Sequence, residues 1–254
     1  MLILFLASAI FVRDYLNTIV SNSKYSAMQV HIPTSGFDFL NELKNNNNRD
    51  WFNLHKANFQ EQQNSIALFA DALLQELNTH DQIETPSGKK SLHRIYRDTR
   101  FSNNKTPYKT NWSGNFKRLG KHRRGGYYFH IEPGNTFIGG GFWAPEPQDL
   151  KLIRQDIAFD DAPLRKILAD ESFTTTFGTL RGEQLKTTPK GFEPGHKATD
   201  LLRYKQFLLM KPFTDEEALS ESFLTQVNLT FKNMRPFFDY MSEVLSTDIN
   251  GLAI

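Results

Sequence analysis

The stretch YYFHIEPGNTFIGGGFW, residues 127–143, decides the fold. Aromatic and β-branched residues favour extended backbone, and they fill the stretch on both sides of its centre. At the centre, Pro133-Gly-Asn135 supplies the residues of a tight turn. The stretch therefore predicts a β-hairpin with strands at 127–132 and 136–143, as part of an antiparallel sheet.

The first strand of this hairpin has one polar and one apolar face. Side chains alternate across a strand, so Tyr128, His130 and Glu132 point to one face and the intervening residues to the other. In the second strand the glycines at 139–141 remove three consecutive side chains. This predicts a packed neighbour that approaches the backbone closely, with a bound ligand as the alternative.

Helical patterns flank the hairpin on both sides. We expect a short helix that begins at Thr34 or Ser35, and a long helix that Asn48 caps and that continues to Leu77. Further helices are expected to begin at Pro147, at Pro163, and after a capping box at Thr214. Three further stretches have strand character: 92–98, 206–210, and 173–180 as a strand pair. Together the patterns predict an α+β fold, in which helices from both ends of the chain flank a mainly antiparallel sheet.

The boundaries of the domain follow from composition. No composition break occurs after residue 33, so we expect residues 28–254 to form a single α+β domain and residues 1–27 to be an N-terminal extension. Met1 to Val12 is apolar but too short to span a bilayer, and no stable membrane insertion is expected. Met28 is a candidate for the true initiator; a weak anchor and an ordinary first helix are the alternatives for residues 1–27.

Composition and missing motifs exclude several classes of protein. The chain has 254 residues, 39% of them hydrophobic, which is enough for a buried core. It has no cysteine, which excludes disulfides and thiolate chemistry and is typical of a cytoplasmic protein. It also lacks the G-x-x-x-x-G-K-[ST], G-x-G-x-x-G, G-x-S-x-G and H-E-x-x-H motifs. The common nucleotide-binding folds, the α/β-hydrolases and the zincins are therefore disfavoured.

A dense group of cations lies between Arg94 and Lys109, which read RIYRDTRFSNNKTPYK. Arginine suits bidentate recognition of phosphate or carboxylate, and lysine adds point charges. We predict an anion site on a strand end and the following loop, with an anionic small molecule as the partner. The predicted ligands are Arg97, Arg100, Lys105 and Lys109, with Asp98 orienting the arginines and Tyr108 lining the wall.

Two alternatives to this anion site remain open. The segment from Lys89 to Arg124 has twelve Lys or Arg residues against one acid, and its run Lys117–Arg124 is KRLGKHRR. Such a run is usually a solvated loop, but the segment 89–124 could also bind a nucleic-acid backbone without reading its sequence. In the third interpretation the cations pair with acids of the same chain, in a structural or partner-binding domain.

His130 and Glu132 are the candidates for catalysis. They share a strand face, and a histidine titrates close to neutral pH, which suits proton transfer. A half-exposed sheet surface is the alternative role for the pair. The seven histidines show no paired metal-ligand spacing, so no metal site is predicted, and the sequence identifies no cofactor, reaction or oligomeric state.

Four motifs in order resemble one known family. They are NNNNRDWF near the start, RIYRDTRFSNNKTPYKT, GGYYFHIEP and IGGGFWAP. They resemble the uncharacterised conserved proteins called domain of unknown function family 2461, over about Phe37 to Leu245. The resemblance implies a single cytoplasmic-type domain and supplies no activity, cofactor or catalytic residue. It also leaves residues 1–27 outside the match.

Overall fold

A four-stranded antiparallel sheet forms the centre of the protein. The computed structural model describes residues 30–247, so the expected N-terminal extension and Met28 lie outside the described residues. The strands are β1 (Trp112–Lys117), β2 (Gly126–Ile131), β3 (Thr136–Phe142) and β4 (Phe207–Phe213), and they lie side by side in that order. The predicted hairpin is confirmed as β2 and β3, in which Tyr128 pairs with Gly139 and His130 pairs with Phe137.

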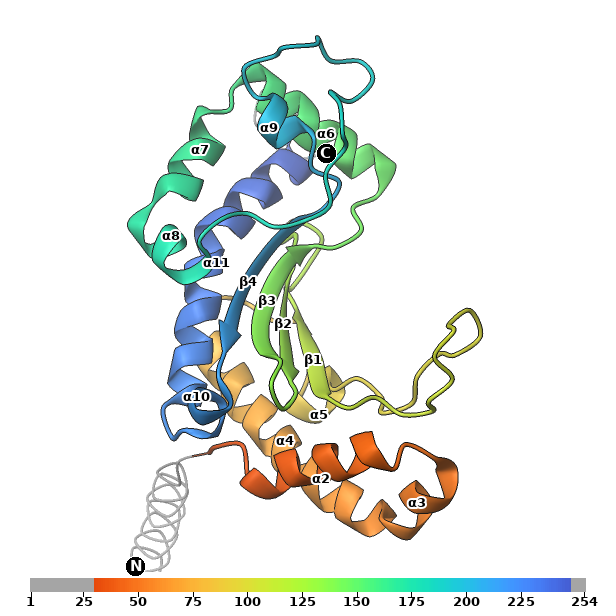
Figure 1. Cartoon of the computed structure of the whole chain (residues 1–254). Helices are drawn as coiled ribbons and strands as arrows, with labels where there is room; N and C mark the ends of the chain where they lie inside the picture. The colour runs from red at the N-terminus through yellow and green to blue at the C-terminus, as the bar shows by residue number, and fades with distance from the viewer. Residues whose placement is uncertain (1–29, 248–254) are drawn as a thin grey trace, which may run out of the picture.

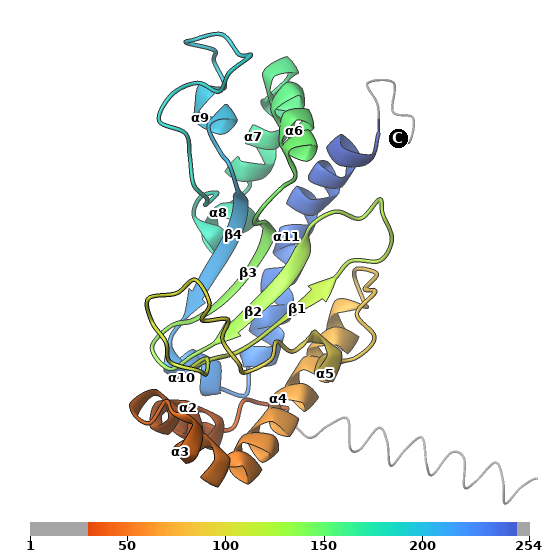
Figure 2. The same ribbon diagram turned by 90° about the vertical axis from the view of Figure 1, so that its right-hand side faces the viewer.

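Helices cover one face of this sheet and leave the other open. The described helices are α2 (Thr34–Asn45), α3 (Arg49–Leu54), α4 (Lys56–Leu77), α5 (Gly88–Ser91), α6 (Pro147–Phe159), α7 (Ala162–Ala169), α8 (Glu171–Phe177), α9 (Thr199–Leu202), α10 (Asp215–Leu219) and α11 (Phe223–Ser246). Helices α11 and α4 run along the convex face of the curved sheet (Figure 1). Figure 2 looks onto the opposite, open face. The predicted α+β class is confirmed.

The apolar face of the hairpin makes the core. Tyr127 and Phe129 of β2 are fully buried, and the Tyr127 ring lies 4.8 Å from that of Phe231 and 5.1 Å from that of Phe238, both on α11. Burying an aromatic side chain contributes roughly 1.5 to 3 kcal/mol. The core is therefore the seam between the sheet and α11, and the even-numbered residues of β2 are left on the open face.

Several predicted elements have different bounds in the structure. Asn48 caps a helix, as predicted, because its side chain accepts from the Trp51 N–H at 2.9 Å, but that helix ends at Leu54 and α4 begins at Lys56. The predicted strand pair at 173–180 is wrong. These residues belong largely to α8, which Asp170 caps by accepting from the Ser172 N–H. Phe173 and Phe177, four residues apart, pack on one helix face and are both buried.

Two more differences concern strands. β1 lies in a basic segment interrupted by glycines, where no strand was predicted, and it pairs with the whole of β2. The predicted strand at 92–98 is reduced to two isolated bridges, Leu92 with Gly114 and Tyr96 with Tyr108. The pairing partner, rather than local composition, decides both outcomes.

The three glycines at 139–141 have packing reasons of their own. A Cβ on Gly140 would lie 2.7 Å from Met234 Sδ and 2.8 Å from the Gly126 carbonyl oxygen, so α11 approaches the strand here. Gly141 has a φ of +127°, and its Cβ would lie 2.1 Å from the Phe207 carbonyl oxygen. Gly139 has more room, because the nearest atom to its Cβ is the Leu209 carbonyl oxygen at 3.3 Å.

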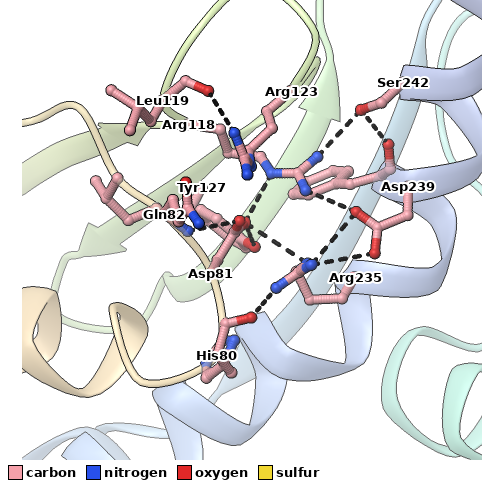
Figure 3. A network of polar contacts seen from close by, with 12 residues as sticks. His80, Asp81, Gln82, Arg118, Leu119, Arg123, Tyr127, Arg235, Asp239 and Ser242 are labelled. Atoms are coloured by element: carbon pink, nitrogen blue, oxygen red, sulfur yellow. Dashed lines mark hydrogen bonds and ion pairs between the residues drawn. The ribbon is translucent and has the colours of Figure 1, made fainter.

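An ion network centred on the buried Arg118 and Asp81 joins the sheet to α11 and to the segment after α4 (Figure 3). Arg118, 2% exposed, donates from Nε to Asp81 Oδ2 at 2.7 Å and from Nη2 to Asp239 Oδ1 at 2.6 Å. The Tyr127 hydroxyl donates to Asp81 at 2.6 Å, and Arg235 of α11 lies 3.6 Å from the same carboxylate. The network ties the segment after α4 to β2 and α11.

The network makes stability depend on pH through Asp81. Burial alone would raise the pKa of Asp81, but hydrogen bonds from Tyr127, from the Gln82 N–H and from Arg118 outweigh burial and hold that pKa below its usual value. A depressed folded-state pKa stabilises the fold above the unfolded value of about 3.9, and this contribution is lost as the pH falls below it. We expect urea midpoints between pH 6 and pH 2.5 to fall less steeply for Asp81→Asn than for the native chain. Equal slopes would contradict this role.

Within residues 30–247, no helix combines the length and the apolar character needed to cross a membrane.

Candidate functional site

The arginine-rich segment folds into two paired legs and a projecting loop. The Arg97 N–H donates to the Pro107 carbonyl at 2.9 Å, and the Lys109 N–H donates to the Ile95 carbonyl at 2.8 Å. Tyr96 and Tyr108 face each other between these bonds as an isolated bridge. Residues 98–106 form the loop, which lies in front of one end of the open sheet face (Figure 2).

One asparagine side chain anchors the second leg. The Asn47 amide donates to the Tyr108 carbonyl at 3.0 Å and accepts from the Tyr108 N–H at 3.1 Å. Tyr108 is 4% exposed, and its ring stacks on Phe52 of α3 at 4.0 Å. Together these contacts fix the position of the arginine segment relative to α3.

Between the two legs and α3 lies a cavity of about 310 Å³, which we call the arginine pocket. It is lined by Arg49, Asn53, Tyr96, Arg97, Thr99, Pro107 and Tyr108. Two of these residues are cations from separate elements, and none is an acid. Within the described chain, Arg49 and Arg97 form no ion pair with a carboxylate, and the Arg97 guanidinium donates to the Thr106 hydroxyl. The arginine pocket is therefore a concave site with two unneutralised positive charges.

The structure brings together only two of the six predicted ligand-binding residues in this pocket, Arg97 and Tyr108. Burial is the main cause that raises the pKa of Tyr108, so its hydroxyl is neutral at physiological pH. Lys109, on the same leg, does not line the pocket. Burial, and then the nearby charge of Arg94, lower the pKa of Lys109.

The other three predicted ligands lie on the projecting loop. Asp98 accepts from Arg100 Nη2 at 2.6 Å, and this hydrogen bond is the main cause that lowers the pKa of Asp98. Asp98 thus orients one arginine, but both side chains are exposed and outside the pocket. Lys105 donates to the Thr99 carbonyl at 2.9 Å. An anion clamp formed by all four predicted cations therefore stays a prediction, and in this structure they do not meet.

His130 and Glu132 form a pair on the open face of the sheet. His130 Nε2 lies 2.9 Å from Glu132 Oε2, and His130 Nδ1 lies 3.1 Å from the Tyr128 hydroxyl. Glu132 also accepts from Thr110, the residue after Lys109, at 2.7 Å. Neither member of the pair lines the arginine pocket, and both ring nitrogens of His130 are occupied. Their catalytic role stays a prediction.

The basic run 117–124 is more than a solvated loop. Arg118 is buried in the ion network, Arg124 pairs with Asp149, and Lys117 pairs with Glu84 at 3.0 Å. The interpretation of the whole run as solvated is therefore wrong at Arg118, whose side chain is 1% exposed. Internal pairing holds for these three cations and not for Arg97. Nucleic-acid binding by segment 89–124 stays a prediction, and Arg118 is unavailable for it.

Sequence reasoning missed three residues of this site: Arg49, Asn53 and Asn47. Arg49 and Asn53 lie four residues apart on α3 and point to the same side of the helix. Two signals lay nearby: the Asn48 helix cap, and the NNNNRDWF motif, which contains Asn47 and Arg49. No spacing rule connects residues 49 and 53 to residue 97, because a tertiary contact brings them together.

No group of three or more His, Cys, Asp or Glu side chains within residues 30–247 could hold a metal ion. A family model described as "Conserved hypothetical protein (DUF2461)" matches residues 35–240. No curated protein and no solved structure matches the chain.

Proposed function

The chain belongs to the DUF2461 family, and from its geometry we propose that it binds a small molecule through a phosphate or carboxylate group held between Arg49 and Arg97. One observation carries the proposal. Two arginines from separate segments line one cavity, and no carboxylate lines that cavity with them.

The electrostatics favour an external anion at this position. Two guanidinium groups repel each other, so holding them around one cavity costs free energy unless a negative charge lies between them. Each arginine presents several N–H donors in a fixed plane, which match the oxygens of a phosphate or carboxylate. Arg100 on the same segment does not share this property, because Asp98 already neutralises it.

The walls of the pocket indicate an organic ligand rather than a free ion. Tyr96, Pro107 and Tyr108 offer ring surface, while Asn53 and Thr99 add neutral hydrogen-bonding groups. A volume of about 310 Å³ is at the small end of ligand sites in proteins. A single ring carrying one anionic group has the expected size.

We expect phenyl phosphate or benzoate to bind the native chain in isothermal titration calorimetry, and Arg97→Gln or Arg49→Gln to weaken that binding about tenfold or more. A hydrogen bond to a charged group contributes roughly 1.5 to 3 kcal/mol, which corresponds to that loss. Binding that is unchanged in both variants, or absent for both probes at millimolar concentration, would rule out the proposal.

Two further variants serve as comparisons in the same titration. Arg123→Gln removes a half-buried arginine outside the arginine pocket, whose guanidinium donates only to the Leu119 carbonyl among the contacts of the described chain, so we expect native affinity. Arg100→Gln distinguishes binding in the arginine pocket from binding by a clamp that uses the projecting loop. A change of less than about twofold agrees with the pocket, whereas a loss as large as that of Arg97→Gln would favour the loop.

A further inference from the structure

The open face of the sheet contains a second hollow, separate from the arginine pocket. Its volume is about 570 Å³. Its rim is formed by Tyr128 and His130 on β2, Phe137 at the start of β3, Trp143 just after β3, and Leu208 and Met210 on β4. Trp143 is 70% exposed, although it is the largest apolar side chain of this rim. We call this cavity the sheet hollow.

Glycine makes the sheet hollow. Gly139 lies in register between Tyr128 on one neighbouring strand and Met210 on the other, so all three belong to the same face. This row has a large side chain at each end and none in the middle, so it forms a groove whose floor is the backbone of Gly139. The His130 ring stacks on Phe137 at 4.7 Å, with an angle of 14° between the rings, and closes part of the rim with flat surface. The shape suits a flat, largely apolar molecule.

The polar groups at the rim have a defined hydrogen-bond direction. Burial would raise the pKa of Glu132, but hydrogen bonds from His130, Thr110 and Asn135 outweigh burial and lower that pKa. Glu132 is therefore ionised near neutral pH and can only accept hydrogen bonds. Since Glu132 Oε2 lies 2.9 Å from His130 Nε2, that nitrogen must carry the proton.

The imidazole ring of His130 determines the direction of the next hydrogen bond, the one to the Tyr128 hydroxyl. In a neutral imidazole with the proton on Nε2, Nδ1 is an acceptor. For this neutral form of the ring, the Tyr128 hydroxyl, 3.1 Å from Nδ1, is the donor of the hydrogen bond between them. Burial is the main cause that raises the pKa of Tyr128, so the phenol keeps this proton. The Ser113 side chain acts in the opposite sense and lowers that pKa, but burial outweighs it. What Tyr128 offers to a ligand is the remaining acceptor capacity of its oxygen, with no free hydrogen.

We propose that the sheet hollow binds a flat, largely apolar molecule that donates an N–H or O–H hydrogen bond to Tyr128 Oη. Glu132 and His130 are positioning residues in this site, because they fix the direction of the Tyr128 proton without touching the ligand's donor. This site is independent of the arginine pocket and selects for different chemistry, a hydrogen-bond donor instead of an anion.

The test compares indole with 1-methylindole, in which a methyl group replaces the donor hydrogen. In ¹⁵N-labelled full-length protein, we expect both probes to shift the backbone amide resonances of Gly139 and Gly141. Indole should bind about three- to tenfold more tightly, which is the usual contribution of one neutral hydrogen bond. Equal affinities, or glycine resonances that do not move with either probe up to its solubility limit, would overturn the proposal.

Tyr128→Phe keeps the ring and removes only the oxygen, so it should bring indole down to the affinity of 1-methylindole. Retention of the indole preference in Tyr128→Phe would also overturn the proposal. Gly139→Ala raises the floor of the sheet hollow by one methyl group, whose carbon would lie 3.3 Å from the Leu209 carbonyl oxygen, so β4 must shift slightly to accept it. It should weaken both probes. If Gly139→Ala does not fold, Leu208→Trp fills the same space from β4 and must weaken both probes.

Discussion

Replacing Arg118 with alanine is expected to lower the free energy of unfolding by about 3 to 5 kcal/mol, the usual cost of removing one partner from a buried ion pair. Arg118 is the largest fully buried side chain of the described residues. Its removal leaves the Asp81 carboxylate, 1% exposed, with the Tyr127 hydroxyl, the Gln82 N–H and a more distant Arg235 as its partners. It also leaves the Arg124 carbonyl without the Nη1 donor at 2.9 Å.

The adjacent residue is a matched control for this measurement. Lys117 also pairs with an acid, Glu84, but the two side chains are 67% and 45% exposed. Exposed pairs contribute about 0 to 1 kcal/mol, so Lys117→Ala should shift the urea midpoint only slightly. Similar losses for the two variants would mean that the buried network does not stabilise the fold as described.

The contrast between these neighbours shows what a sequence can and cannot reveal. Lys117 and Arg118 belong to the same basic run, and no local property separates them. What separates them is that Asp81 and Asp239, far away in the chain, both reach Arg118. Burial of a charge is decided by tertiary contacts, so the run looked uniformly solvated.

Features that depend on local chemistry were predicted correctly. The β2–β3 hairpin, the Asn48 cap, the helix start at Pro147 and the Thr214 capping box all involve residues close together in the chain. The strand predicted at 206–210 is present as β4 (Phe207–Phe213). β1, in contrast, was missed. The Trp112, Gly114 and Phe116 alternation of β1 was hidden by its glycine and asparagine, and only pairing with β2 makes this stretch a strand.

In the candidate site too, features set by local spacing were predicted, and features set by contacts distant in the sequence were not. The pairing of His130 with Glu132 follows from their spacing on one strand, and it is present at 2.9 Å. The cation density around Arg97 pointed to a segment that lines the arginine pocket, but not to which cations remain free. Asp98 and Arg100 neutralise each other, whereas Arg49 joins Arg97 from a helix more than forty residues earlier. Charge counting cannot make that distinction, because it depends on where each side chain finds a partner.

Gly88→Ala is expected to destabilise the protein by about 3 kcal/mol, at the upper end of the cost of inserting a methyl group into a packed site. A Cβ at this position would lie 2.2 Å from the Asp71 nitrogen and 2.5 Å from the Ala67 carbonyl oxygen, both backbone atoms of α4. Backbone cannot move aside as a side-chain end can. The whole segment of α5 must therefore shift, and the 2.6 Å hydrogen bond from the Gly88 N–H to Asp71 Oδ1 is lost.

The same substitution at Gly36 should have the opposite sign. Gly36 lies in α2, and the atoms nearest to an added Cβ are 3.7 Å away, which is ordinary contact. Alanine is favoured over glycine in a helix by up to about 1 kcal/mol, so Gly36→Ala should raise the urea midpoint while Gly88→Ala lowers it. A Gly88→Ala variant as stable as Gly36→Ala would contradict the close packing of α5 on α4. The chain continues from α5 into Leu92 and then β1, so the two midpoints together report whether the packing of α5 on α4 stabilises this part of the sheet.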